Sequence, residues 1–184
     1  LYGLMAEIEM IRSICDNANV LLIEDCAQAF GANLDGRSVG SWGDAATFSF
    51  YPTKNLGGIG DGGMVVTNDE DVAERVRRLR VHGQSEQYVH IEVSQNYRMS
   101  EIEAAWLNIV LSQLTDGNAR RRDIANRYQE ANPDIHWQRS DPNHVYHLAV
   151  TRLSDRESFR RYLGERGIST GVHYPLALTQ QPAL

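Results

Sequence analysis

Apolar positions in the first 25 residues change from a helical period to a short continuous run. A helix already under way at the start of the chain is predicted by apolar residues spaced three or four apart: Leu4, Ile8, Ile11 and Ile14. Residues 20–23 (VLLI) are apolar throughout and lead directly into Glu24 and Asp25. Such a run is typical of a buried parallel strand, so we expect it to deliver both acids at its carboxyl end.

Two further strands are predicted before residue 70. Small and aromatic side chains alternate in residues 45–51, and Pro52 ends this strand because proline has no N–H to donate to a sheet. Residues 62–67 (GGMVVT) form the next predicted strand, and Asn68 or Asp69 is expected to cap a helix that runs to about Arg80. Because strands and helices alternate, the pattern predicts an α/β fold with a mostly parallel sheet flanked by helices.

Helical patterns dominate the next part of the chain. Ser100 and Glu103 form a capping-box variant at the start of a helix that is expected to end near Leu114. The helical pattern resumes over residues 118–130. These are expected to be long helices that connect two parts of the protein.

A smaller unit is predicted beyond a linker that Pro133 and Pro142 bracket. Its expected strand, helix and second strand cover residues 145–151, 154–166 and 168–174. We therefore expect two domains, a partial large domain over residues 1–131 that includes the connecting helices, and a partial small α+β domain over residues 132–184.

The composition is that of a folded protein. Hydrophobic residues make up 42% of the 184 residues and charged residues 23%, and a chain of this length can bury roughly 70% of its unfolded surface, so we expect a substantial core. A net charge of −6 without a block of Lys or Arg argues against nucleic acid as a partner. No apolar stretch is long enough for a membrane span and no signal peptide is recognisable, so the sequence predicts a cytoplasmic protein without a membrane partner.

The cysteines and histidines predict no metal site. Cys15 and Cys26 are spaced neither as C-x-x-C nor as part of a metal quartet, and we expect both to be small buried residues. The H-x-x-H pattern of His144 and His147 lacks the further ligands of a zinc motif. We interpret these histidines as ordinary core or surface residues.

The glycines at 58, 60 and 63 match the dinucleotide-binding pattern G-x-G-x-x-G. That pattern binds a pyrophosphate only where it follows a strand and opens a helix. Here the glycines precede a predicted strand, so we reject a dinucleotide site. Instead, they either form a tight turn or allow a bulky ligand to approach the backbone.

Four polar residues are expected to meet at the carboxyl ends of two neighbouring strands. Asp25 ends one strand, Gln28 follows three residues later, Ser49 lies near the end of the next strand, and Lys54 comes just beyond it. Lys54 is also the only lysine among 18 basic residues. Open α/β sheets bind ligands at this edge. Each residue alone has a common structural role in caps, turns or surfaces, but together they supply what pyridoxal 5'-phosphate needs: an amine for the aldehyde, a carboxylate for the ring nitrogen, and polar groups for the phosphate.

Several motifs in this order and spacing resemble one enzyme family. They are EDCAQAFGANLDGRSVGSWGDAATFSFYPTKNLGGIGDGGMVVTND, RLRVHG, NYRMSEIEAA and GVHYPLALTQQPA. The chain resembles the DegT/DnrJ/EryC1/StrS family of pyridoxal-phosphate-dependent sugar aminotransferases, within the aspartate aminotransferase (fold type I) group. The resemblance runs over nearly the whole length and implies that these residues are an internal fragment of a longer enzyme.

The resemblance implies roles for the four residues at the strand ends. Lys54 would bind the cofactor aldehyde and later carry the proton, and Asp25 would pair with the ring nitrogen. Gln28 would lie against the ring and its 3-hydroxyl. Ser49 would donate to the phosphate.

Three further site residues are implied by the same resemblance. Asn96 would reach the phosphate bound in the neighbouring subunit, which implies a homodimer with shared sites. His173 and Tyr174 match a segment near the sugar nucleotide. Ser94 and Thr179 depart from the family, which usually has glycine and often histidine there.

The implied function is transfer of an amino group from a donor, commonly glutamate, to a nucleotide-linked keto sugar. The motif around Lys54 is most similar to members that aminate C-3 of dTDP-linked 3-keto-6-deoxy sugars. Two alternatives are a sugar dehydratase branch, against which Lys54 argues because that branch has histidine there, and a non-catalytic cofactor-binding regulator, which the sequence leaves open.

Overall fold

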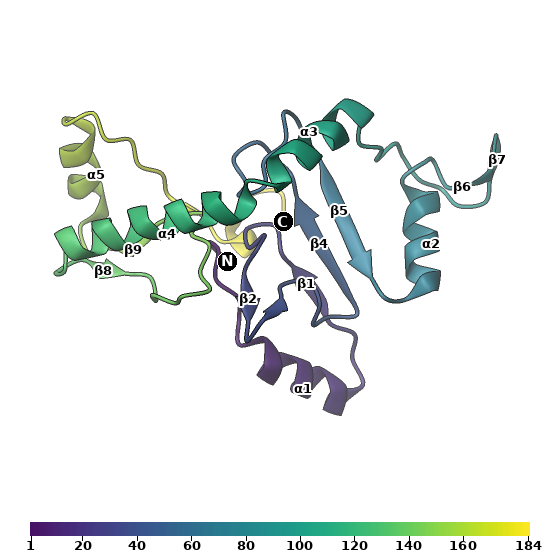
Figure 1. Cartoon of the computed structure of the whole chain (residues 1–184), viewed down its shortest axis with the longest axis horizontal. Coiled ribbons are helices and arrows are strands. Elements are labelled where there is room, and N and C mark those ends of the chain that lie inside the picture. Colours follow the sequence, from purple (N-terminus) through teal and green to yellow (C-terminus); the bar gives the residue numbers. More distant parts are fainter.

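A three-stranded sheet organises the structure, a computed structural model that describes all 184 residues. Its strands are β1 (Ile23–Asp25), β4 (Ala45–Ser49) and β5 (Gly63–Thr67), in the order β1-β4-β5 (Figure 1). β1 and β4 are parallel, whereas β4 and β5 are antiparallel. The predicted α/β class is confirmed, but within this sheet the expectation of mostly parallel strands is wrong. No helix lies between β4 and β5, and without a crossover the chain returns in the opposite direction.

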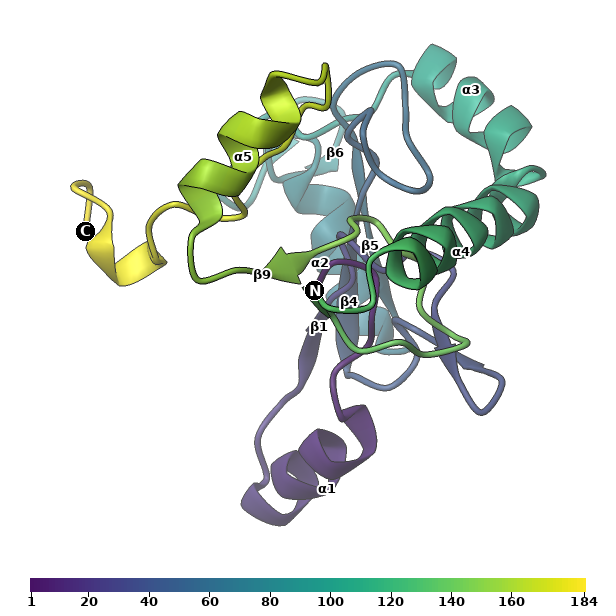
Figure 2. The same ribbon diagram turned by 90° about the vertical axis from the view of Figure 1, so that its left-hand side faces the viewer.

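The remaining elements surround this sheet or extend away from it (Figures 1 and 2). The helices are α1 (Ile8–Ala18), α2 (Glu70–Leu79), α3 (Glu101–Leu111), α4 (Leu114–Ala131), α5 (Arg156–Gly164) and the short 3-10 helix η1 (Leu178–Gln180). Three two-stranded pairs are formed by β2 (Asn33–Leu34) with β3 (Arg37–Ser38), β6 (Gln84–Glu86) with β7 (Val89–His90), and β8 (His136–Trp137) with β9 (Thr151–Arg152). Figure 2 shows α5 and the C-terminus on the side opposite α3 and α4.

Two helices start at the predicted caps, whereas α1 begins at Ile8 and the expectation of a helix already under way at the start of the chain is wrong. Asp69 accepts a hydrogen bond from the backbone N–H of Val72, and Ser100 accepts one from Glu103, each at 3.1 Å. Of the two candidates at the start of α2, Asp69 is therefore the cap. The helix predicted over residues 118–130 is α4, which begins earlier than expected, at Leu114. Only two residues separate it from α3.

Three predicted strands differ from the structure. β1 begins at Ile23, because Leu22 donates its N–H to the Asp44 carboxylate at 2.7 Å instead of continuing a regular ladder. Of the predicted strand 145–151 only Thr151 lies in a strand, β9. Residues 168–174 form no strand, because no other segment of the chain pairs with them.

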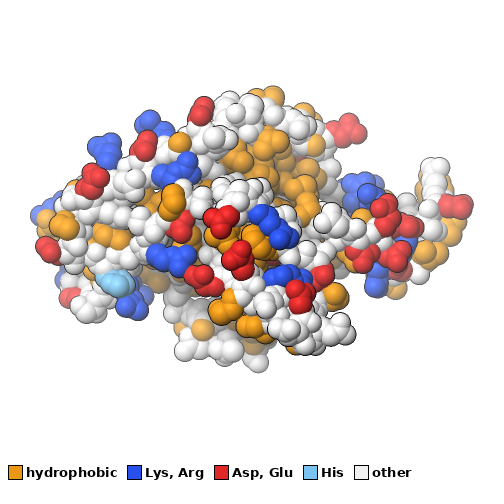
Figure 3. Space-filling view, turned by 60° about the horizontal axis from the view of Figure 1, so that its bottom comes forward, with side chains coloured by type: hydrophobic (Ala, Val, Ile, Leu, Met, Phe, Trp, Pro, Cys, Tyr) orange, Lys and Arg blue, Asp and Glu red, His pale blue; other side chains and the backbone are white.

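The core is small. Only 18 of 184 residues are buried, and 11 of these are hydrophobic. Six of the 11 form two clusters of three: Ala29, Ala32 and Val145, and Phe50, Leu56 and Leu107. Large apolar side chains stay exposed on β1 and α3, and Figure 3 shows orange patches between charged side chains. The expectation of a substantial core is wrong for this chain, because none of its elements covers these faces.

None of its helices is both long and apolar enough to cross a membrane.

Candidate functional site

Asp25 and Ser49 lie on one face of the sheet. Asp25 is paired in register with Thr47, and Ser49 stands two residues further along the same strand. Because side chains alternate between faces, all three point to the same side. The exposed Asp25 carboxylate accepts one hydrogen bond, from the N–H of Ala27 at 3.1 Å. The Ser49 hydroxyl accepts one from the N–H of Tyr51 at 3.3 Å. Both side chains therefore stand where their strands end.

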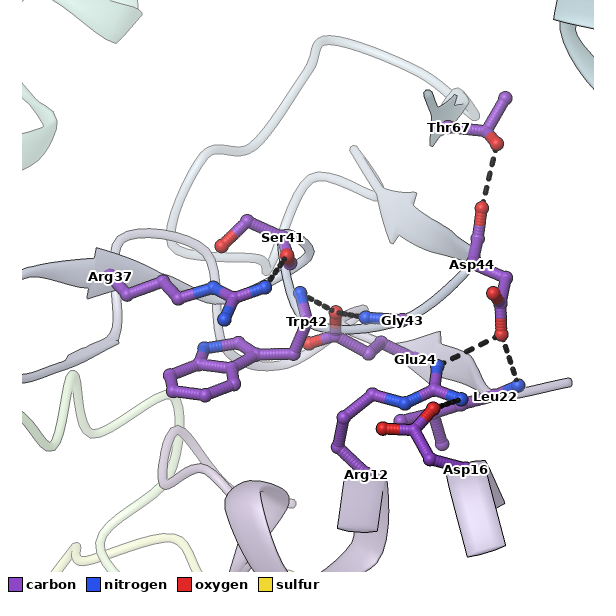
Figure 4. A network of polar contacts seen from close by, with 10 residues as sticks. All are labelled: Arg12, Asp16, Leu22, Glu24, Arg37, Ser41, Trp42, Gly43, Asp44 and Thr67. Atoms are coloured by element: carbon purple, nitrogen blue, oxygen red, sulfur yellow. Dashed lines mark hydrogen bonds and ion pairs between the residues drawn. The ribbon is translucent and has the colours of Figure 1, made fainter. Parts of the chain in front are cut away.

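Glu24 points to the opposite face and has a structural role (Figure 4). Its carboxylate is 7% exposed and accepts hydrogen bonds from the N–H groups of Gly40, Trp42 and Gly43 at 2.9, 2.7 and 2.7 Å. These bonds hold the loop before β4 against β1. Of the two acids at the end of β1, only Asp25 is therefore free to bind a ligand.

Asp44 extends the same polar network toward α1. It accepts hydrogen bonds from the N–H of Leu22 at 2.7 Å and from the Arg12 guanidinium at 3.0 Å. These two donors lower the pKa of Asp44, the backbone N–H contributing more. The Asp44 carboxylate thus fixes the backbone at Leu22, directly before β1, and so helps to fix the position of Asp25 at the end of that strand.

Lys54 lies in the turn directly after β4. Its backbone N–H donates to the carbonyl of Tyr51 at 2.8 Å, and its side chain is half-buried. The charge of Lys54 acts on His147, whose pKa is lowered to about 4 by burial first and then by the charges of Lys54, Arg121 and His173. His147 is 8% exposed, and its Nδ1 has no hydrogen-bond partner. His147 is therefore neutral at neutral pH.

A buried amide pair holds the Lys54 turn in place. Asn55 donates through Nδ2 to Asn118 Oδ1 and to the carbonyl of Val145, both at 2.7 Å. Asn118, on α4 and 4% exposed, donates to the carbonyl of Phe30 at 3.1 Å. The pair thus connects the lysine turn to α4 and to the loop after β1. A Cβ at Gly31, whose φ is +90°, would lie 2.6 Å from Asn118 Nδ2, so this contact needs glycine there.

Gln28 connects the N-terminal and C-terminal segments. Its Oε1 accepts from the N–H of Tyr2 at 2.7 Å, and its Nε2 donates to the hydroxyl of Tyr174 at 3.3 Å. The hydroxyl of Tyr2 donates to the carbonyl of His173 at 2.5 Å. Gln28 therefore lies beside the His173–Tyr174 segment, although about 145 residues separate them in the sequence.

Asn96 lies apart from the other predicted site residues. It is exposed in the segment after β7, where its Oδ1 accepts from the N–H and Nε of Arg98 at 3.1 and 3.0 Å. Its backbone pairs with Val81 in an isolated bridge. No contact joins it to Asp25 or Lys54, so the structure of one chain does not bring it into their group.

The glycine run before β5 packs closely against Glu103. A Cβ at Gly58 would lie 1.5 Å from Oε1 of Glu103, a residue that is 4% exposed. Gly63 is the first residue of β5, so the run leads into a strand, as expected from the sequence. Close packing against Glu103 therefore accounts for the glycine at position 58.

The cysteines are free, and Cys26 is not a nucleophile at neutral pH. Cys26 is buried, as expected, and burial, followed by the charges of Glu24 and Asp25, raises the pKa of its thiol to about 12. It therefore stays protonated. Cys15 is only half-buried. No group of three His, Cys, Asp or Glu side chains is placed to hold a metal ion.

The donor set fits pyridoxal 5'-phosphate. The exposed Asp25 carboxylate accepts only one hydrogen bond, which leaves it able to accept another from a protonated ring nitrogen. Lys54 supplies the only side-chain primary amine of the chain, and Ser49 supplies a hydroxyl on the same face as Asp25. The sequence did not predict three supporting residues: Asn55 and Asn118 hold the turn that contains Lys54, and Tyr2 holds Gln28 and His173.

Comparison with known proteins gives consistent results. The profile of the DegT/DnrJ/EryC1/StrS aminotransferase family matches residues 1–184. A dTDP-3-amino-3,6-dideoxy-alpha-D-galactopyranose transaminase of Aneurinibacillus thermoaerophilus is 48% identical over an alignment that covers 100% of this chain and 52% of that protein. The Erythromycin biosynthesis sensory transduction protein EryC1 of Saccharopolyspora erythraea is 42% identical over 100% of this chain and 51% of its own length.

A solved structure shows the same fold over the whole chain. The crystal structure of S. venezuelae DesV in complex with a ketimine intermediate superposes with a TM-score of 0.94 and 40% sequence identity. The match covers 100% of this chain and 51% of that one. The chain thus spans about half the length of the proteins it matches.

Proposed function

The chain belongs to the DegT/DnrJ/EryC1/StrS aminotransferase family, and we propose that it is the part of a sugar aminotransferase that holds pyridoxal 5'-phosphate through Lys54 and Asp25. The full-length protein would move an amino group from glutamate to a dTDP-linked 3-keto-6-deoxyhexose. The observation that carries this proposal is the placement of Asp25 and Ser49 on one face of the sheet, with Lys54 in the turn that follows.

The protein residues have distinct chemical roles in this proposal. When bound, the cofactor draws electrons from the α-carbon of the amino donor. Lys54 Nζ would hold the cofactor aldehyde and, once displaced by the donor amine, would take the α-proton as a general base and return it. Asp25 would keep a proton on the ring nitrogen. Gln28 would lie against the 3-hydroxyl, and Ser49 would donate to the phosphate.

His147 would add no charge to the site at neutral pH. Burial first, and then nearby positive charges, lower its pKa to about 4, so its imidazole would stay neutral.

His173 and Tyr174 are proposed to contact the sugar nucleotide. Their support is the hydrogen bond from Gln28 to the hydroxyl of Tyr174 and the hydrogen bond from Tyr2 to the carbonyl of His173, which place this segment beside Gln28. The name of the Aneurinibacillus relative supports a dTDP-linked 3-amino sugar as the product. The homodimer, the contact of Asn96 with the phosphate of a neighbouring subunit, the division into domains 1–131 and 132–184 and the cytoplasmic location remain predictions.

A second candidate function is that of a non-catalytic regulator that binds the same cofactor. The name of the Saccharopolyspora relative, a sensory transduction protein, supports this alternative. The dehydratase alternative has no comparable support, since Lys54 is present where that branch has histidine.

Incubation with amino donor and sugar separates these functions. The full-length protein, loaded with pyridoxal 5'-phosphate, should convert glutamate to 2-oxoglutarate and then aminate a dTDP-linked 3-keto-6-deoxy sugar. UDP-linked and 4-keto sugars are the comparison substrates. Cofactor binding without any amine transfer would support the regulator and contradict the aminotransferase.

A further inference from the structure

Tyr2 contacts three segments that are distant in the sequence. Its N–H donates to Gln28 Oε1 at 2.7 Å, its carbonyl accepts from the N–H of Leu148 at 3.2 Å, and its hydroxyl donates to the carbonyl of His173 at 2.5 Å. Its φ is 60°, in the left-handed region that side-chain-bearing residues seldom adopt. The surrounding hydrogen bonds therefore hold this residue in a conformation that it would not choose alone.

The C-terminal segment depends on these contacts. Residues 169–184 contain only the short helix η1 and no strand. The hydrogen bonds from Tyr2 to His173 and from Gln28 to Tyr174 are the only two that join this segment to the rest of the chain. Its position relative to the lysine turn is therefore set by very few groups.

Tyr2 also fixes the orientation of the Gln28 side-chain amide. A glutamine amide has one accepting and one donating end. Because the N–H of Tyr2 occupies Oε1, the donating Nε2 is the end directed toward Tyr174. Both hydrogen bonds that hold the C-terminal segment thus depend on Tyr2, one directly and the other through the orientation of Gln28.

We propose that Tyr2 is a positioning residue for the sugar substrate, because it sets the His173–Tyr174 segment against Gln28. This rests on the proposed function, in which that segment contacts the sugar nucleotide. Tyr2 has no hydrogen bond to Lys54, Asp25 or Ser49, so its hydroxyl acts in the sugar half-reaction and not in the half-reaction with the amino donor.

The experiment compares Tyr2→Phe with the unaltered full-length enzyme in the two half-reactions separately. The variant keeps the ring and the backbone bond to Gln28 and removes only the hydroxyl. We expect the KM for the sugar nucleotide to rise about 3- to 10-fold, which is what one hydrogen bond contributes. The rate with glutamate, the absorbance of the bound cofactor and the melting temperature should not change. Tyr88→Phe is the matched control, since Tyr88 is 81% exposed.

Two results would overturn the role of Tyr2. One is an unchanged KM for the sugar nucleotide, and the other is an equal slowing of both half-reactions, which would indicate a general structural effect. Limited proteolysis of the segment 169–184 gives a readout that does not depend on activity, and cleavage there should become faster in Tyr2→Phe and not in Tyr88→Phe. If no sugar is aminated, the proposed function fails, whereas unchanged cleavage shows that the anchoring itself is wrong.

Discussion

Replacing Glu24 by glutamine should destabilise the protein while leaving its chemistry in place. Glu24 is 7% exposed and accepts three backbone hydrogen bonds, two at Oε1 and one at Oε2. A glutamine amide can accept at only one end, so its NH2 group would face the N–H of Gly40. The variant loses one charge-assisted hydrogen bond and leaves a buried N–H without an acceptor, which together cost about 2 to 4 kcal/mol.

The neighbouring acid provides the matched control. Asp25 is exposed and accepts a single hydrogen bond, so Asp25→Asn should change the free energy of unfolding by less than about 0.5 kcal/mol. Its effect should instead fall on turnover, because an amide cannot keep the cofactor ring nitrogen protonated. Urea unfolding of the full-length protein without cofactor, followed by tryptophan fluorescence, measures the first quantity for both variants. If Glu24→Gln is no less stable than Asp25→Asn, the assignment of Glu24 as the structural acid is wrong.

Two further predictions concern a tightly packed glycine and pH. Gly58→Ala should lower the free energy of unfolding by at least about 2 kcal/mol, because the added Cβ would overlap the Glu103 carboxylate. Gly117→Ala is the control: this helical glycine has no atom within 4 Å of an added Cβ, so the substitution should stabilise the protein by about 0.5 to 1 kcal/mol. Equal effects of the two substitutions in urea unfolding would contradict this. Burial lowers the pKa values of His144 and His147 to about 4, so the unfolded protein binds more protons than the folded one between pH 4 and their ordinary value near 6.5. Stability is therefore complete above pH 6.5 and should fall toward pH 4, and a His147→Leu variant that shows the same pH slope would refute this origin.

The placement of the candidate site residues could be predicted because it depends on short stretches of sequence. Asp25 and Ser49 follow directly from where two strands end, and Lys54 follows from the proline that stops the second strand. The carboxyl ends of neighbouring strands in a parallel pair meet at one edge whatever the rest of the chain does. Within this sheet the direction of β5 was misjudged, because direction depends on the connection between strands and not on the pattern within them.

The supporting residues could not be predicted because their partners lie far away in the sequence. Asn118 stands in a polar stretch of α4 and looks like a solvent-facing residue until Asn55 and Phe30 are placed beside it. Tyr2 has no distinguishing context in the sequence. The predicted strand over residues 168–174 failed for the same reason, since a strand needs a partner and its own pattern does not supply one.

Borohydride reduction tests the central claim most directly. Treating the full-length protein with pyridoxal 5'-phosphate and then sodium borohydride makes the link between the cofactor and its holding amine permanent, and peptide mass mapping locates it. We expect a single labelled peptide in which Lys54 carries the cofactor, and no label at that position in Lys54→Arg. A label on another amine, or full turnover in the unlabelled Lys54→Arg variant, would contradict it.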